Sequence, residues 1–104
     1  MPIYVGSAMD ILTTVANQTA NRALSTSYQN TNPTIMTVEV TLTAGSASLA
    51  NISMGASSSN MTITRQQTIP ASSVGSMHIA VPHGWWYSVT ANASPTITYW
   101  TETS

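Results

Sequence analysis

Apolar and polar side chains alternate strictly along residues 35–43, where one face consists of Met36, Val38, Val40 and Leu42. Thr37, Glu39 and Thr41 lie on the opposite face. A period of two residues is typical of a β-strand with one buried face. A proline-containing turn signal precedes this segment and a glycine-containing one follows it. The pattern therefore predicts a half-buried strand.

Five further segments carry a similar signal at short intervals, and they cover residues 47–54, 60–66, 76–81, 85–91 and 96–102. In the first of them Asn51 interrupts the alternation, which predicts a β-bulge or a slip in register. Six short strands separated by turns predict one all-β domain, a single antiparallel β-sandwich of jelly-roll or Ig-like type. The order of the strands does not follow from the pattern.

The N-terminal residues differ from the rest, and we expect an arm over residues 1–17 followed by the β-sandwich domain over residues 18–104. Residues 7–10 match a helix-capping box. Thr13, Thr14 and Val15 follow it and are poor helix formers. An extended arm or an extra strand is therefore the preferred interpretation, and a short helix is the alternative.

Five of the seven aromatic residues lie on the last two predicted strands, within "VPHGWWYSV" and "TITYWTE". Alternation places Trp85, Tyr87 and Tyr99 with the core and Trp86 and Trp100 on the other face. A buried aromatic side chain removes about 150–250 Å² from water, which makes it an effective anchor for a small domain. We therefore expect a structural role for the first three.

The outward-facing pair has two interpretations. Trp86 and Trp100 either lie against another subunit or form a shelf on which a sugar stacks, with His83 beside them. A stacking surface without a charged or calcium-binding rim is a weak sign of a lectin, so a packing role is the preferred interpretation. Trp86, Trp100 and His83 are the candidate contacts to a glycan or a subunit.

Charge is the most unusual property of this chain, because only five of its 104 side chains are ionised: Asp10, Arg22, Glu39, Arg65 and Glu102. Serine, threonine and asparagine occupy most polar positions. Soluble domains normally carry many charges of both signs, because a net charge near zero favours association. We infer that copies of this chain or a larger assembly cover much of its surface. A poorly charged soluble domain is the alternative.

The same inventory argues against several functions. Two arginines cannot neutralise a series of phosphates, so nucleic acid is not an expected partner. No apolar run approaches the length of a membrane span, and there is no cysteine for a disulfide or a thiolate metal site. His78 and His83 fall on opposite faces with Pro82 between them, so no zinc site is expected within one chain. An ion held by one histidine from each subunit of a trimer remains the exception. We expect no enzyme, no metal and no cofactor.

The region from Gln18 to Leu42 resembles a module of tailed-bacteriophage structural proteins, and its characteristic positions here are Arg22, Tyr28, Asn30 and Thr31. That module closes with V-P-x-G-x-x-Y-x-V and a strand that contains tryptophan. Residues 81–89 and 96–102 match those two features. The resemblance covers about four fifths of the chain and depends on the order and spacing of the motifs.

The resemblance implies a non-enzymatic β-sandwich of the virion, which the family uses in tail fibres, tail tips and small head-surface proteins, commonly as trimers. We therefore expect a capsid decoration (cement) protein that is assembled in the host cytoplasm and binds the major capsid protein or other virion proteins as a homotrimer. Arg22 is expected to make a structural bond near the start of the domain, and a contact between subunits is its alternative role. A tail-fibre or tail-tip module that binds a host receptor or surface glycan is the alternative function. The expected structural anchors are Arg22, Tyr28, Trp85, Tyr87 and Tyr99.

Overall fold

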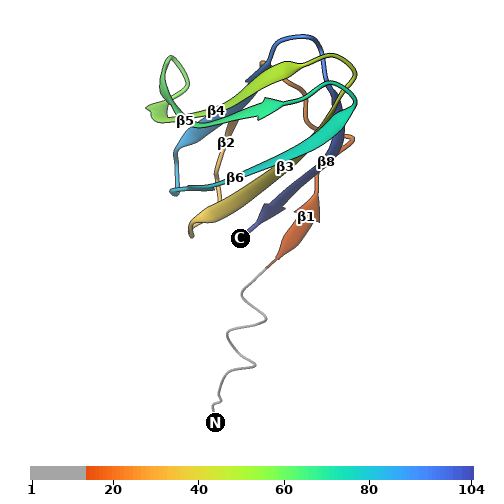
Figure 1. The fold of residues 1–104 in the computed structure, drawn as a ribbon. Coiled ribbons are helices and arrows are strands. Elements are labelled where there is room, and N and C mark those ends of the chain that lie inside the picture. The colour runs from red at the N-terminus through yellow and green to blue at the C-terminus, as the bar shows by residue number, and fades with distance from the viewer. Residues whose placement is uncertain (1–13) are drawn as a thin grey trace.

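Residues 14–104 form two facing antiparallel sheets of four strands each in the computed structural model, which describes this part of the chain (Figure 1). Sheet I has the strand order β1-β8-β3-β6, and sheet II has the order β2-β7-β4-β5. The strands are β1 (Val15–Asn17), β2 (Ser27–Gln29), β3 (Met36–Ala44), β4 (Ser48–Ser57), β5 (Asn60–Ile69), β6 (Ser73–Val81), β7 (Trp86–Ala91) and β8 (Thr96–Thr103).

The pairing of the strands is nested. β4 pairs with β5, β3 with β6, β2 with β7 and β1 with β8, so that a long antiparallel hairpin is rolled into two layers. Further pairing of β3 with β8 and of β4 with β7 joins these pairs into the two sheets. The arrangement confirms the predicted antiparallel β-sandwich and is the jelly-roll type. No helix of the described residues is long and apolar enough to cross a membrane.

The core lies between the sheets and contains the residues that strict alternation assigned to it. The apolar side chains of β3 are buried throughout, from Met36 to Ala44. Met77, Ile79 and Val81 of β6 are buried beside them, and the register pairs Val38 with Ile79. The predicted inward faces of these two strands are therefore confirmed.

The prediction for β8 was wrong at both of its aromatic residues. Trp100 is fully buried with 0% of its surface exposed, whereas Tyr99 is 54% exposed. The cause is an irregularity in the pairing with β3, since Thr41 pairs with Tyr99 but Leu42 pairs with Ile97. The extra residue, Thr98, reverses the phase of the alternation, as a β-bulge does.

Trp85 was also wrongly assigned to the core, because β7 begins only at Trp86. Gly84 has a φ of 81°, in the left-handed region that glycine adopts without a steric penalty. The Trp85 amide donates to the Pro82 carbonyl oxygen at 3.1 Å. This turn takes Trp85 out of the alternating pattern and leaves it 37% exposed.

The bulge predicted at Asn51 is absent. In β4 the side chains of Ala50 and Ile52 are buried and Leu49 points outward, so the alternation continues through Asn51. The irregularities occur further along, in the pairing of β4 with β5.

The sandwich begins three residues before its expected start at residue 18, because Val15–Asn17 pairs with residues 101–103 of β8. This short strand agrees with the extra strand that was preferred over a helix. The capping box at residues 7–10 lies outside the described residues.

Gly55 and Gly45 provide a matched test of the packing. A Cβ atom at Gly55 would collide with the backbone carbonyl oxygen of Asn60 and lie 3.0 Å from the Met61 Cα, whereas a Cβ at Gly45 has no heavy atom within 4 Å. We expect Gly55→Ala to lower the free energy of unfolding by about 1–3 kcal/mol, as overpacking does. Gly45→Ala should leave it unchanged or raise it by up to about 1 kcal/mol. Denaturant unfolding measures both, and equal values for the two variants would contradict the observed packing.

Candidate functional site

A cluster of polar and aromatic side chains, the interior cluster, lies between the sheets at the end of the sandwich near β1. Its members are Arg22, Tyr28, Tyr87, Trp100 and Glu102. Arg22 comes from the segment between β1 and β2, and Glu102 comes from β8. The Arg22 Nε and Nη2 atoms donate to the two carboxylate oxygens of Glu102, each at 3.0 Å. This two-point geometry is the strong form of an arginine–carboxylate pair.

Glu102 is held from a second side by the core of the protein. The Tyr87 hydroxyl donates to Glu102 Oε2, and the Trp100 indole nitrogen donates to the Tyr87 hydroxyl oxygen at 3.1 Å. Tyr87 and Trp100 are both fully buried. Buried polar groups are costly unless they are hydrogen-bonded, and each side chain in this series has a partner.

The aromatic rings of the interior cluster also pack against one another. The ring centroids of Tyr28, Tyr87 and Trp100 lie 5.9–6.2 Å apart in tilted and edge-to-face arrangements. The Arg22 guanidinium carbon is 4.4 Å from the centroid of the Tyr28 ring. Both geometries fall within the favourable range for aromatic and cation–π contacts.

The environment of the cluster keeps its proton donors protonated. Burial raises the pKa of Tyr87 far above its ordinary value, and the hydrogen bond and charge of Glu102 raise it further, while contacts with Trp100 and Arg22 act in the opposite direction. Burial lowers the pKa of Arg22, but the hydrogen bond and charge of Glu102 more than compensate, so it is raised. A hydroxyl that resists ionisation and a permanently charged guanidinium are suited to holding structure and unsuited to exchanging protons.

The interior cluster brings together all three sequence motifs on which the phage resemblance depends. Arg22 and Tyr28 belong to the first motif and Tyr87 belongs to the second. Trp100 is the tryptophan of the third, the last strand β8. Arg22, Tyr28 and Tyr87, three of the expected structural anchors, thus lie together in this cluster. Residues from three motifs that are distant in the sequence therefore pack against one another in this cluster.

Asn30 is one of the motif positions, but its burial and its role in fixing the neighbouring turn were not predicted from the sequence. The Asn30 side-chain nitrogen donates to the carbonyl oxygens of Thr34 and Val81, each at 2.9 Å, and its side-chain oxygen accepts from the Asn32 amide. Its backbone bonds to Trp85 and Gly84 on the other side of the turn. The signal in the sequence was its place in the motif, two residues after Tyr28.

The turn around Gly84, to which the Asn30 backbone is bonded, carries aromatic residues that retain exposed surface. His83 is exposed, and Trp86 is half-buried on the outer side of sheet II, in register with Gln29 and Gly55. Ring nitrogen Nδ1 of His83 lies 2.6 Å from the Asn32 carbonyl oxygen. The structure thus brings two candidate contacts, Trp86 and His83, to one end of the sandwich and adds Trp85 to them. Trp100, the third candidate, is in the core and cannot meet a glycan or a subunit.

The outer surface carries very little charge. Arg22 and Glu102 form the single ion pair among residues 14–104, which leaves Glu39 and Arg65 as the other charged side chains of that region. Glu39 faces outward on β3 beside His78 of β6. No group of three or more histidine, aspartate or glutamate side chains is placed to hold a metal ion in the described part of the chain.

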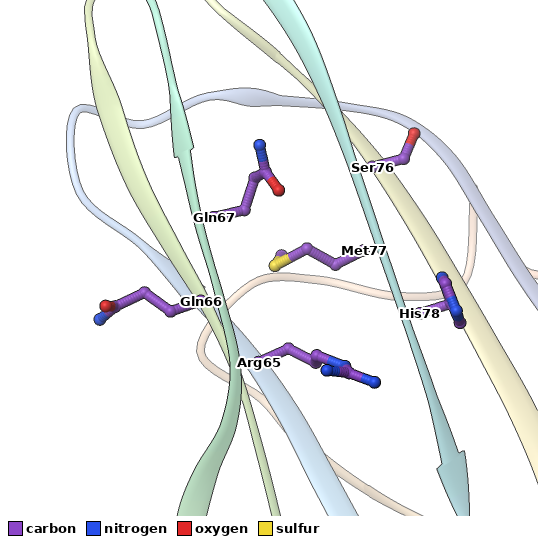
Figure 2. A pocket seen from close by; sticks show the side chains of 6 residues that line it. All are labelled: Arg65, Gln66, Gln67, Ser76, Met77 and His78. Atoms are coloured by element: carbon purple, nitrogen blue, oxygen red, sulfur yellow. The ribbon is translucent and has the colours of Figure 1, made fainter.

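Two hollows on the surface of residues 14–104 adjoin charged side chains. One, of about 370 Å³, lies between the edge strands β5 and β6 and is lined by Arg65, Gln66, Gln67, Ser76, Met77 and His78 (Figure 2). The other, of about 290 Å³, lies beside Arg22 and Glu102 and is otherwise lined largely by amides and hydroxyls. Three of the Arg22 N–H groups there are bonded, two to the Glu102 carboxylate and one to the Asn21 carbonyl oxygen.

Comparison of this chain with known protein families, curated proteins and solved structures found no match.

Glu102 and Glu39 allow a matched test of the interior cluster. Glu102→Gln keeps the shape of the side chain but leaves Arg22 without its counter-charge, and we expect it to lower the free energy of unfolding by about 2–3 kcal/mol, somewhat less than for a fully buried pair. Glu39→Gln removes an exposed charge on the neighbouring strand and should change stability by less than about 0.5 kcal/mol. Chemical denaturation followed by tryptophan fluorescence measures both. Similar losses would show that the ion pair has no special structural role.

The raised pKa of Tyr87 determines how the free energy of unfolding should change at alkaline pH. Its raised pKa means that the folded state retains a proton which the unfolded state loses near the ordinary tyrosine pKa of about 10. The stabilisation is therefore complete below about pH 10 and falls as the pH rises further. Tyr87→Phe should be less stable at neutral pH but lose less stability between about pH 9 and 11, while Tyr99→Phe, at an exposed ring, keeps the original slope. Unfolding curves across this range test the assignment, and an unchanged slope in Tyr87→Phe would refute it.

Proposed function

We propose that this chain is a non-enzymatic structural protein of a bacteriophage virion that binds the exterior of the head as a homotrimer and stabilises it. Its partners in this proposal are its own copies and the major capsid protein. The observation that carries the proposal is the composition of the outer surface. Apart from the partly buried Arg22–Glu102 pair, residues 14–104 carry two charged side chains, Glu39 and Arg65.

A nearly uncharged surface is suited to repeated contacts on a particle. Hydrogen bonds of hydroxyl and amide groups, together with apolar contacts, are less sensitive to salt than exposed ion pairs. The outer side of sheet I offers such groups in quantity, because the outward positions of β3 and β8 are mostly threonines. Three copies that bind together also convert a modest affinity at each site into a high overall affinity.

The interior cluster supports a structural function, because its polar side chains are engaged with one another. Arg22, Glu102 and Tyr87 include chemically versatile groups, but they bond to one another inside the sandwich. Jelly rolls are used in viral capsid proteins and in lectins. The fold is therefore compatible with the proposal but does not by itself select a function.

The alternative is a tail-fibre or tail-tip module that binds a host receptor or surface glycan. The observation that favours it is the group of Trp85, Trp86 and His83 at one end of the sandwich, where both tryptophans retain exposed surface. Aromatic faces of this kind allow a sugar ring to stack. The loss of Trp100 to the core leaves this shelf smaller than the sequence indicated.

Particles of the encoding phage that lack this protein distinguish the two proposals. When purified protein is added, we expect saturable density on the head exterior with threefold symmetry in electron cryomicroscopy, and binding that changes little with salt. Density on the tail alone, or no binding, would contradict the decoration proposal.

A glycan array with Trp86→Ala, and with Tyr99→Ala as the matched exposed aromatic, tests the alternative. Sugar binding that only Trp86→Ala abolishes would establish the glycan module instead.

A further inference from the structure

The edge strand β6 is unusually open to pairing. It is in continuous register with β3 over all nine of its residues, from Ser73 to Val81. Its other side has no strand partner among the described residues. Proteins normally protect long edge strands with charged residues, proline, bulges or a covering segment. β6 contains no charged residue, no proline and no bulge along its pairing with β3.

The other three edges of the sandwich lack this combination. β1 and β2 are each three residues long. β5 is long, but its pairing is interrupted between Ile52 and Ser53 of its neighbour, and it carries Arg65 and ends immediately before Pro70. β6 is therefore the edge at which another chain adds most readily.

The hollow between β5 and β6 gives this edge the shape of a groove. At the turn between the two strands the groove is closed, because Ile69 from β5 packs so closely on Gly75 that a Cβ there would lie 2.7 Å from its Cγ1 atom. Further along, Figure 2 shows Arg65 and Met77 extending toward one another across the gap while Gln66 turns away. Arg65 places one positive charge at this point.

Residues 1–13 have the composition of a segment that fits such an edge. They include Ile3, Tyr4 and Val5 in sequence, which favour an extended strand. Their one charged residue is Asp10. The described residues include two arginines, and Arg22 is paired with Glu102. Arg65 is therefore the arginine that is available to pair with Asp10.

The position of β1 indicates that the segment comes from a second copy. β1 and β6 are the two opposite edges of sheet I, separated by three strand spacings or about 14 Å. Because each intervening pair is antiparallel, β1 runs antiparallel to β6. When the β1 edge of one copy is placed beside the β6 edge of the next, residues that lead into β1 run along β6 in the antiparallel direction.

The length of the segment is sufficient for this contact. Thirteen extended residues span about 43 Å, whereas the nine residues of β6 extend over about 30 Å. The contact joins unlike surfaces, so its repetition closes into a ring when the rotation between copies allows it. A ring of three corresponds to the homotrimer.

We propose that residues 1–13 of one copy add to β6 of a second copy as an antiparallel strand, with Asp10 beside Arg65. The inference rests on the proposed function in one respect, the self-assembly of the chain. It identifies the surface that makes the subunit contact and leaves the threonine-rich face of sheet I for the particle.

Engineered disulfides test this contact directly, because the natural chain has no cysteine. The double variant Asp10→Cys, Arg65→Cys is purified as the full chain, oxidised and separated on a non-reducing denaturing gel. We expect a covalent trimer. The matched control combines Asp10→Cys with Asn51→Cys, on the outer side of sheet II, and should cross-link about tenfold less, because that pair lacks the high effective concentration of an assembled contact.

Three results would overturn the proposal. One is a disulfide within a single chain, which would place the arm on its own sheet. The second is equal cross-linking in the control. The third is efficient dimer formation by Arg65→Cys alone, which would indicate that β5 and β6 edges of two copies face each other. Cross-linked trimers that fail to bind phage heads would leave this contact established and refute the decoration proposal. Head binding by a variant pair that does not cross-link would do the reverse.

Discussion

The fold depends on one partly buried interaction, the two-point ion pair between Arg22 and Glu102 with Tyr87 and Trp100 bonded behind it. It joins the segment before β2 to β7 of sheet II and to β8 of sheet I. Arg22 and Glu102 are eighty residues apart in the sequence. A domain of about a hundred residues has a small core and no disulfide here, so a satisfied polar network that fixes one arrangement of the strands is valuable.

This interaction also determines what the surface lacks. Two of the five charged residues neutralise each other in a partly buried pair, and of the rest Glu39 lies on sheet I and Arg65 on the β5 edge. The outside is therefore dominated by threonine, serine and asparagine side chains, together with one long edge strand without protection. A surface of this composition disfavours isolated molecules and favours assembly. The structural and functional arguments thus depend on the same distribution of charge.

Sequence reasoning succeeded where one face of a strand is uniformly buried. The class of fold, the inward face of β3 and that of β6 follow from alternation alone. It failed where a local irregularity changes the phase. The extra residue at Thr98 exchanges the roles of Tyr99 and Trp100, and the turn at Gly84 removes Trp85 from its expected face. The strand order and the partner of Arg22, eighty residues away, depend on tertiary packing that no local pattern records.

Sedimentation equilibrium of the full chain across a range of salt and protein concentrations tests the central claim, that the uncharged exterior is an assembly surface. The account predicts a particle of three times the 11.0 kDa chain mass, with an association that is nearly the same at low and high ionic strength because few charges take part. A stable species of single-chain mass at concentrations of about 100 μM, where even weak specific contacts form, would contradict it.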